Sequence, residues 1–171
     1  MKIAFLDPAD ASTDALVVAV GAENALSPAA EAADKATGGA VSRAIAASRF
    51  TGKPRQFLDL LAPNGLSIGR LVLAGLGKPA EANAKAWQDW AGAAYSHLAS
   101  SGAASVTLQV ETMGGPLPES DAAANAAFGV GLACYRFDRY RTTEKPDQKP
   151  SVTEATIMVA GAKAAEEAHT P

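Results

Sequence analysis

The sequence has few of the residues that build disulfides, metal sites and nucleic-acid interfaces. Its 171 residues include one cysteine, Cys134, and two histidines, His97 and His169. A single cysteine excludes an intramolecular disulfide, and a chain without disulfides is suited to the reducing cytoplasm. The 15 lysines and arginines are outnumbered by 18 aspartates and glutamates, which gives a net charge of −3. This charge disfavours nucleic acid as a partner, because phosphate binding needs an excess of basic residues.

Long apolar runs are also missing. No stretch approaches the roughly 20 apolar residues that cross a bilayer, so we expect no membrane partner. The first eight residues carry an apolar run too short for a secretory signal, and Asp7 and Pro8 interrupt it. Hydrophobic residues make up 48% of the chain and charged residues 19%. These proportions are ordinary for a globular protein, and the length fits one domain.

The sequence does contain an alternation of strand and helix patterns. Short apolar runs alternate with longer segments in which apolar residues recur every three to four positions. Strands are predicted at 2–7, 14–20, 56–61, 70–74, 105–110 and 152–160, the third and fourth as a hairpin. Helices are predicted from Ser27, as N-cap before Pro28, from Ala40, over 81–100 and over 120–140. This order predicts a three-layer α/β/α fold with a mixed, mostly parallel sheet.

Each of the two long helices has an apolar face that is expected to pack inward. The second helix is expected to begin at Ser120 as N-cap, and its apolar stripe consists of Phe128, Leu132 and Tyr135. The apolar face of the first helix consists of Trp87, Trp90, Ala91, Ala94, Tyr95 and Leu98.

Two glycine-containing segments are candidate ligand-binding sites. Gly75, Gly77 and Lys78 follow the strand at 70–74, and Gly114 and Gly115 follow the strand at 105–110. Glycines after a strand let the backbone approach a phosphate, and open α/β sheets bind ligands beyond the carboxyl ends of their strands. The two segments could therefore line one cleft. Neither completes a nucleotide-binding motif, so the alternatives are a tight strand-to-helix turn with a solvated lysine and a loop before a helix.

The histidines and the cysteine carry no recognisable catalytic pattern. His97 is expected at the edge of its helix and His169 in a tail, and no His-Glu-x-x-His motif occurs. Cys134 has no histidine close in sequence to serve as its base, so a buried structural thiol is favoured over a nucleophile.

A basic and aromatic cluster lies near the end of the second long helix. Such a mixture could stack on bases or bind an acidic partner. The alternative is a helix end at which the arginines favour the helix dipole and the aromatics pack inward. The cluster consists of Tyr135, Arg136, Phe137, Arg139, Tyr140 and Arg141.

Two segments carry a resemblance to a known family. The apolar strand is followed by Gly-Leu-Gly-Lys at 75–78, and the second long helix ends in Tyr-Arg-Phe-Asp-Arg-Tyr-Arg at 135–141, followed by Thr-Thr-Glu-Lys. Together they resemble the amino-terminal domain of the leucyl (cytosol) aminopeptidases, the two-metal M17 peptidases. The resemblance is strongest over 70–143 and implies a macrodomain-like fold.

The same resemblance implies a function for the parent protein rather than for this chain. The parent would be a hexameric aminopeptidase with two divalent metals, zinc or manganese. This chain would accompany its catalytic domain and serve assembly, access to the active sites or regulation. The family's catalytic hallmark, Asn-Thr-Asp-Ala-Glu-Gly-Arg-Leu, does not occur here. No catalytic or metal-binding residue and no cofactor can therefore be assigned, and the chain alone is not expected to be an enzyme.

Residues 1–161 are expected to form the macrodomain-like domain, and 162–171 a tail leading toward a catalytic domain. Two alternatives remain at this point. One is a free-standing macrodomain-type module that binds a nucleotide or an ADP-ribose-like ligand at the glycine segments. The other is a scaffolding subunit without a catalytic half.

Overall fold

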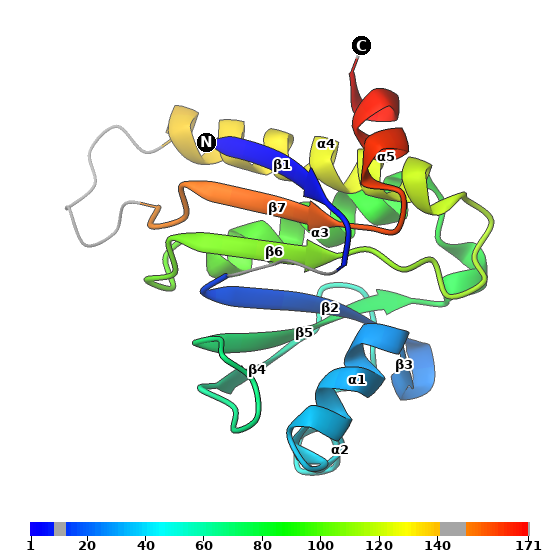
Figure 1. Cartoon of the computed structure of the whole chain (residues 1–171), viewed down its shortest axis with the longest axis vertical. Helices are drawn as coiled ribbons and strands as arrows, with labels where there is room; N and C mark the ends of the chain where they lie inside the picture. Colours follow the sequence, from blue (N-terminus) through cyan, green and yellow to red (C-terminus); the bar gives the residue numbers. More distant parts are fainter. Residues whose placement is uncertain (9–12, 141–149, 171) are drawn as a thin grey trace.

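The structure is a computed structural model that describes residues 1–8, 13–140 and 150–170, with the side chains of 136–140 excepted. Its centre is a mixed sheet with the strand order β1-β7-β6-β2-β5-β4, in which β3 pairs with β2 (Figure 1). The neighbours are parallel except for the β2–β3 and β4–β5 pairs. The strands are β1 (Lys2–Leu6), β2 (Ala15–Gly21), β3 (Ala25–Leu26), β4 (Phe57–Leu61), β5 (Arg70–Gly77), β6 (Ser105–Gln109) and β7 (Glu154–Met158).

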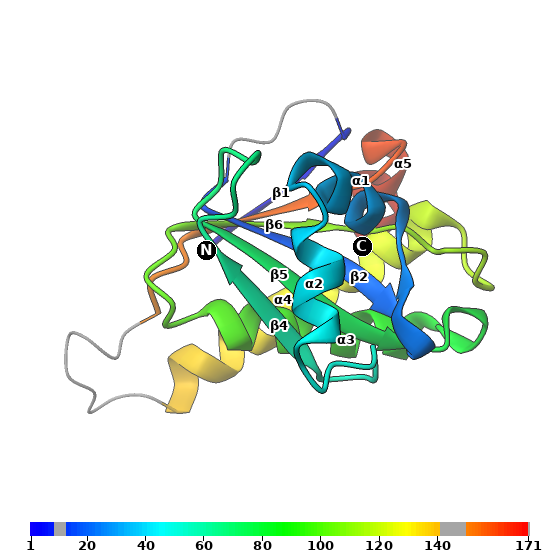
Figure 2. The same ribbon diagram turned by 90° about the horizontal axis from the view of Figure 1, so that it is seen from below.

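Helices cover both faces of the sheet, which confirms the predicted mixed, mostly parallel α/β/α architecture (Figure 2). One face carries α1 (Pro28–Ala36) and α2 (Ala40–Ala46), and the other carries α3 (Ala84–Leu98) and α4 (Glu119–Tyr140). The central strands β2 and β5 are buried almost throughout because both of their faces are covered. None of the described helices is long and apolar enough to cross a bilayer.

The predicted inward face of α3 is confirmed. All six residues of the predicted apolar face are buried, and Trp87 and Trp90 pack edge to face with ring centroids 5.3 Å apart. The Trp90 indole Nε1 donates to the backbone oxygen of Ala74 at 3.2 Å, which ties the helix to β5. The helix begins later than predicted, because Pro79–Glu81 form a separate 3-10 turn and Asn83 caps α3 by accepting from the Ala86 amide at 3.0 Å.

The predicted packing of α4 is wrong in two respects. The helix begins at Glu119, and the Ala122 amide bonds to the Pro118 oxygen, so Ser120 lies inside the helix and is not its N-cap. The stripe formed by Phe128, Leu132 and Tyr135 faces outward, with exposed fractions of 49%, 42% and 62%. The buried face consists instead of Ala122, Ala123, Ala126, Ala127 and Val130.

The close approach of α3 and α4 explains this reversal. A Cβ on Gly129 would lie 2.1 Å from the backbone oxygen of Gln88, and one on Gly92 would lie 3.0 Å from the Gly129 oxygen. Nearby, the Gln88 side chain donates to Asn125 at 2.7 Å. Where the two helices approach this closely, glycine is required and most neighbouring positions are alanine, so the large side chains of Phe128, Leu132 and Tyr135 face away from the core.

The chain continues past β7 into a helix that the sequence pattern did not predict. This helix, α5 (Ala162–His169), packs against α4 and β1, and its Ala162 and Ala165 are buried. The His169 ring lies 5.6 Å from the ring of Phe5 on β1. The domain limit at residue 161 remains a prediction, but Ala162–His169 pack against the domain.

Candidate functional site

The first glycine segment belongs to a strand and not to a turn, contrary to the prediction. Strand β5 continues through Gly75 to Gly77, and a neighbouring segment of backbone crosses it closely. A Cβ on Gly75 would lie 1.9 Å from the Lys53 oxygen. Gly77 has φ +82° and donates from its amide to the Gly52 oxygen at 2.9 Å. These two glycines are thus required by the crossing of the 52–54 backbone.

The second glycine segment is a turn, and the fold brings it to the first. Gly114 has φ +80°, and a Cβ on Gly115 would lie 2.6 Å from the oxygen of Pro79, the residue after Lys78. Lys78 is exposed. The two segments therefore lie near each other, and a shared ligand-binding cleft between them remains a prediction.

The start of α1, at the same end of the sheet, is occupied by the protein's own groups. Pro28 has no amide hydrogen, the Ala29 amide donates to the Glu111 carboxylate at 2.9 Å, and the Ala30 amide donates to the Ser27 hydroxyl at 3.3 Å. The next amide, that of Glu31, bonds to the Ser27 oxygen. A helix start binds an anion through free amides, and α1 has none left in its first turn.

Glu111 is half-buried, and its charge is costly there. Desolvation raises the pKa of the Glu111 carboxyl, the bond from Ala29 works in the opposite direction, and the nearby Glu119 raises the pKa further. The carboxylate fills a position that a ligand anion would otherwise take.

An open cavity of about 320 Å³ lies on the other side of β5. Gly75 and Leu76 of the strand, Arg55 of the preceding loop, and Lys85 and Trp90 of α3 are among its lining residues. Of the five candidate residues in the two glycine segments, only Gly75 lines this cavity. Arg55 was not a candidate in the sequence, because a lone arginine in a loop carries no motif.

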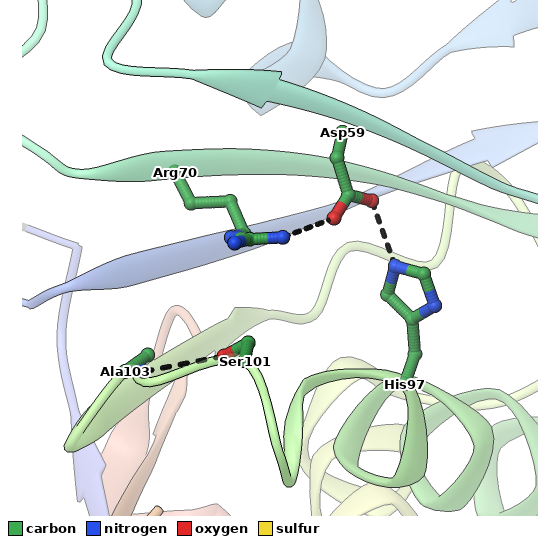
Figure 3. A network of polar contacts seen from close by, with 5 residues as sticks. All are labelled: Asp59, Arg70, His97, Ser101 and Ala103. Atoms are coloured by element: carbon green, nitrogen blue, oxygen red, sulfur yellow. Dashed lines mark hydrogen bonds and ion pairs between the residues drawn. The ribbon is translucent and has the colours of Figure 1, made fainter. Parts of the chain in front are cut away.

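A polar network ties the hairpin β4–β5 to α3 (Figure 3). Asp59 on β4 accepts from Arg70 Nη1 on β5 and contacts His97 Nε2 on α3, both at 2.7 Å. The His97 ring also stacks on Phe57, with centroids 4.4 Å apart and an interplanar angle of 11°. An Asp–His pair supports nucleophilic catalysis only with a serine, threonine or cysteine beside the histidine. Among the described side chains no serine, threonine or cysteine bonds to His97, and the contacts of Asp59 join β4, β5 and α3.

Figure 3 also shows a separate bond in the loop after α3, from the Ala103 amide to the Ser101 hydroxyl at 3.2 Å. The thiol of Cys134 is half-buried against the core and not fully buried as predicted. Of the predicted basic and aromatic cluster, only the Tyr135 side chain is described, and it is exposed rather than packed inward. The other five members lie outside the described side chains.

Metal-binding residues do not converge anywhere in the described part of the chain. No group of three or more histidine, cysteine, aspartate or glutamate residues is placed to hold an ion. The residues present therefore do not fit the two-metal centre that the sequence resemblance implies for the parent enzyme.

Comparison with known proteins decides the family. Residues 17–144 match the model of the cytosol aminopeptidase family, N-terminal domain. The chain belongs to this family. A probable cytosol aminopeptidase of Caulobacter vibrioides is 42% identical over 173 aligned residues, which cover 100% of this chain and 34% of the relative. One from Rhodopseudomonas palustris is 42% identical over 132 residues, 77% of this chain and 26% of the relative. This member of the cytosol aminopeptidase family thus spans about a third or less of these relatives.

Solved structures confirm the macrodomain-like fold. A variant of tomato leucine aminopeptidase superposes with a TM-score of 0.73 at 22% identity, over 98% of this chain and 35% of its own. A Trypanosoma brucei macrodomain in complex with ADP-ribose superposes with a TM-score of 0.69 at 13% identity, over 98% of this chain and 67% of its own. The bottromycin maturation enzyme BotP in complex with Mn gives a TM-score of 0.61 at 18% identity, over 92% of this chain and 29% of its own. At these identities the likeness concerns the fold alone.

Proposed function

We propose that this chain is the non-catalytic N-terminal domain of a two-metal aminopeptidase and contributes a docking surface to its assembly. The family match and the length of the relatives support the first part. On this proposal the two metals, zinc or manganese, are held elsewhere in the parent protein.

The observation that carries the docking role is the outward stripe on α4. Phe128, Leu132 and Tyr135 are spaced by four and three residues, so they form a single ridge along the helix. They account for three of the six large apolar side chains that the described residues expose. Contiguous exposed apolar surface is typical of interaction sites rather than of a free surface.

The occupant of this stripe is, on this proposal, the remainder of the aminopeptidase polypeptide. Relatives carry about twice as much additional chain as the part matched here. The described chain ends just after α5, which packs against α4. A following domain would therefore begin beside the helix that carries the stripe.

Two leucine substitutions test the docking role. Leu132→Ser and the control Leu61→Ser each remove an exposed leucine, but Leu61 lies on β4 at the far edge of the sheet and is 67% exposed. In the isolated chain both should change the melting temperature little. In a chimera that continues into the remainder of the Caulobacter relative, only Leu132→Ser should lower the melting temperature and increase hydrogen exchange in α4. Equal effects of the two variants in the chimera would contradict the proposal.

Against the alternative of a nucleotide-binding module stand the filled start of α1 and the buried role of the glycines in β5. In both places the backbone amides that a phosphate would need already donate to other groups of the protein. The family match also favours the aminopeptidase assignment, because it covers most of the chain.

A further inference from the structure

The cavity between β5 and α3 combines an apolar floor with balanced charges. Its apolar lining comes from Pro54, Leu76, Ala86 and Trp90. Trp90 is 4% exposed, and its bond to the Ala74 oxygen fixes the ring. A volume of about 320 Å³ is at the lower end of the range for small-molecule sites. Both the size and the rigid floor favour a small ligand with one apolar group.

Four charged residues line the cavity: two of them form an ion pair, and the other two are unpaired among the described residues. Lys85 and Asp89 bind each other at 2.7 Å and so neutralise one another. Arg55 and Glu81 also line the cavity, and neither forms an ion pair with any described residue. One free cation and one free anion therefore border the same apolar floor.

This charge balance selects among ligand classes. A nucleoside diphosphate would bring at least two negative charges to a rim with one unpaired cation, Arg55, and one unpaired carboxylate, Glu81, which would repel it. A ligand with one carboxylate and one ammonium group can pair with Arg55 and Glu81 at once. The Lys85 amide, in the first turn of α3, makes no hydrogen bond within the described residues and adds a donor for a carboxylate.

The loop at one side of the cavity has a strained and closely packed backbone. Arg55 has φ +65°, a left-handed conformation that is uncommon for a residue with a side chain. The loop that precedes it crosses β5 at Gly75, where no Cβ fits. Such strain is concentrated at functional sites, and here it fixes the loop that bears the arginine.

We propose that this cavity binds a free α-amino acid with an apolar side chain. The carboxylate pairs with Arg55, the ammonium group pairs with Glu81, and the side chain packs on Trp90 and Leu76. Amino acids of this kind are released by aminopeptidases, so on the proposed function the ligand is a product of the parent enzyme. The binding itself does not depend on that function and is measurable on this chain alone.

The test is a titration of the purified chain with L-leucine, followed by tryptophan fluorescence and by thermal shift. Trp87 and Trp90 are the two tryptophans of the chain, so the fluorescence reports on the cavity floor. A saturable change is expected. Leucinamide, which lacks the carboxylate, and N-acetyl-leucine, which lacks the ammonium group, should each bind at least about tenfold more weakly.

Charge-removing variants assign the partners. Arg55→Gln should weaken leucine binding at least about tenfold and leave the weak binding of leucinamide unchanged, while Glu81→Gln should do the same with N-acetyl-leucine. Glutamine at position 55 keeps the left-handed backbone as unfavourable as arginine does, so the loop strain is matched. Arg49→Gln and Glu31→Gln, exposed positions outside the cavity, are controls that should not change binding.

Three results would overturn the proposal. One is the absence of a saturable signal up to about 10 mM leucine, which is about ten times the upper end of usual KM values. Another is equal binding of leucine and both analogues. The third is a saturable response to ADP-ribose that Lys78→Ala abolishes, which would assign ligand binding to the glycine segments. A failed leucine titration leaves the docking test on α4 unaffected, so the two proposals fail independently.

Discussion

At the scale of single residues, two positions show that backbone distant in sequence can determine the structural role of a residue. Gly75 looked like part of a phosphate-binding turn because the sequence shows only its local context. The structure places it inside β5 beneath the Lys53 carbonyl. Glu111 carried no motif at all, yet it occupies the start of α1. In both cases the partner is distant in sequence, so no local pattern could have revealed the role.

Gly75→Ala should therefore be strongly destabilising. Its Cβ would meet backbone atoms, which cannot move aside as a flexible side chain can. We expect a loss of about 3 kcal/mol in the free energy of unfolding. Gly131→Ala is the matched control, because a Cβ there meets nothing within 4 Å in α4 and should stabilise the helix by ~0.5–1 kcal/mol. Urea unfolding of both variants checks this, and similar midpoints would show that the 52–53 backbone does not lie over Gly75.

Glu111→Gln should change how stability depends on pH. The pKa of this carboxyl is raised in the folded state from an ordinary value of 4.5, so the folded protein holds the proton to higher pH than the unfolded chain. Its contribution is fully present below the unfolded pKa and is lost as pH rises through the folded pKa. Glutamine keeps an oxygen for the Ala29 amide and removes the desolvated charge.

The variant should thus equal or exceed the parent in stability at pH 7 and be relatively less stable at acidic pH. Asp14 and Asp34 have lowered pKa values, caused mainly by hydrogen bonds from the Ser105 amide and the Ser42 hydroxyl respectively. Their contributions to stability are lost as pH falls, equally in the parent and in the variant. The difference between variant and parent isolates Glu111. Denaturant midpoints from pH 4 to 8 measure it, with Glu31→Gln as control, and a difference that does not vary with pH would refute the desolvation of Glu111.

At the scale of elements, the sequence correctly predicted the features that depend on neighbouring residues in the chain, such as a helix start or an apolar helix face. Ser27 before Pro28 predicted the start of α1, and the three-to-four spacing of Trp87, Trp90 and Leu98 predicted the inner face of α3. The orientation of α4 was missed because apolar spacing marks a face without saying which way it points. The face rich in alanine turns inward because α3 approaches closely at Gly129. The cavity could not be predicted either, since Arg55, Glu81 and Trp90 come from separate elements.

Trp90→Ala tests the assignment of α3 as the anchor of its layer. The side chain is 4% exposed, packs on Trp87 and bonds to the Ala74 oxygen, which would lose its partner. Truncation should cost about 3–5 kcal/mol. Tyr135→Ala on α4 removes an aromatic ring that is 62% exposed and should cost little. Equal denaturant midpoints for the two variants would mean that α3 does not face the sheet as described.

At the scale of the whole molecule, the two layers of helices differ in the groups and surfaces that they leave free to bind a partner or ligand. On the side of α1, the amides of the first helical turn are used by Ser27 and Glu111. On the side of α3 and α4 lie the open cavity and the exposed stripe. We propose that this macrodomain-like domain acts within a larger enzyme and that its binding features lie on the α3/α4 layer rather than at the glycine segments.

The central claim is that this chain takes part in an aminopeptidase without performing the chemistry. The most direct measurement is an assay of the purified chain on leucine anilide substrates with added manganese or zinc. Two-metal hydrolysis needs convergent carboxylates that hold two ions about 3.5–4 Å apart, and the described residues contain no converging group of metal ligands. No turnover above the metal-only reaction is expected. Metal-dependent turnover that survives repurification and follows the protein through the column would contradict it.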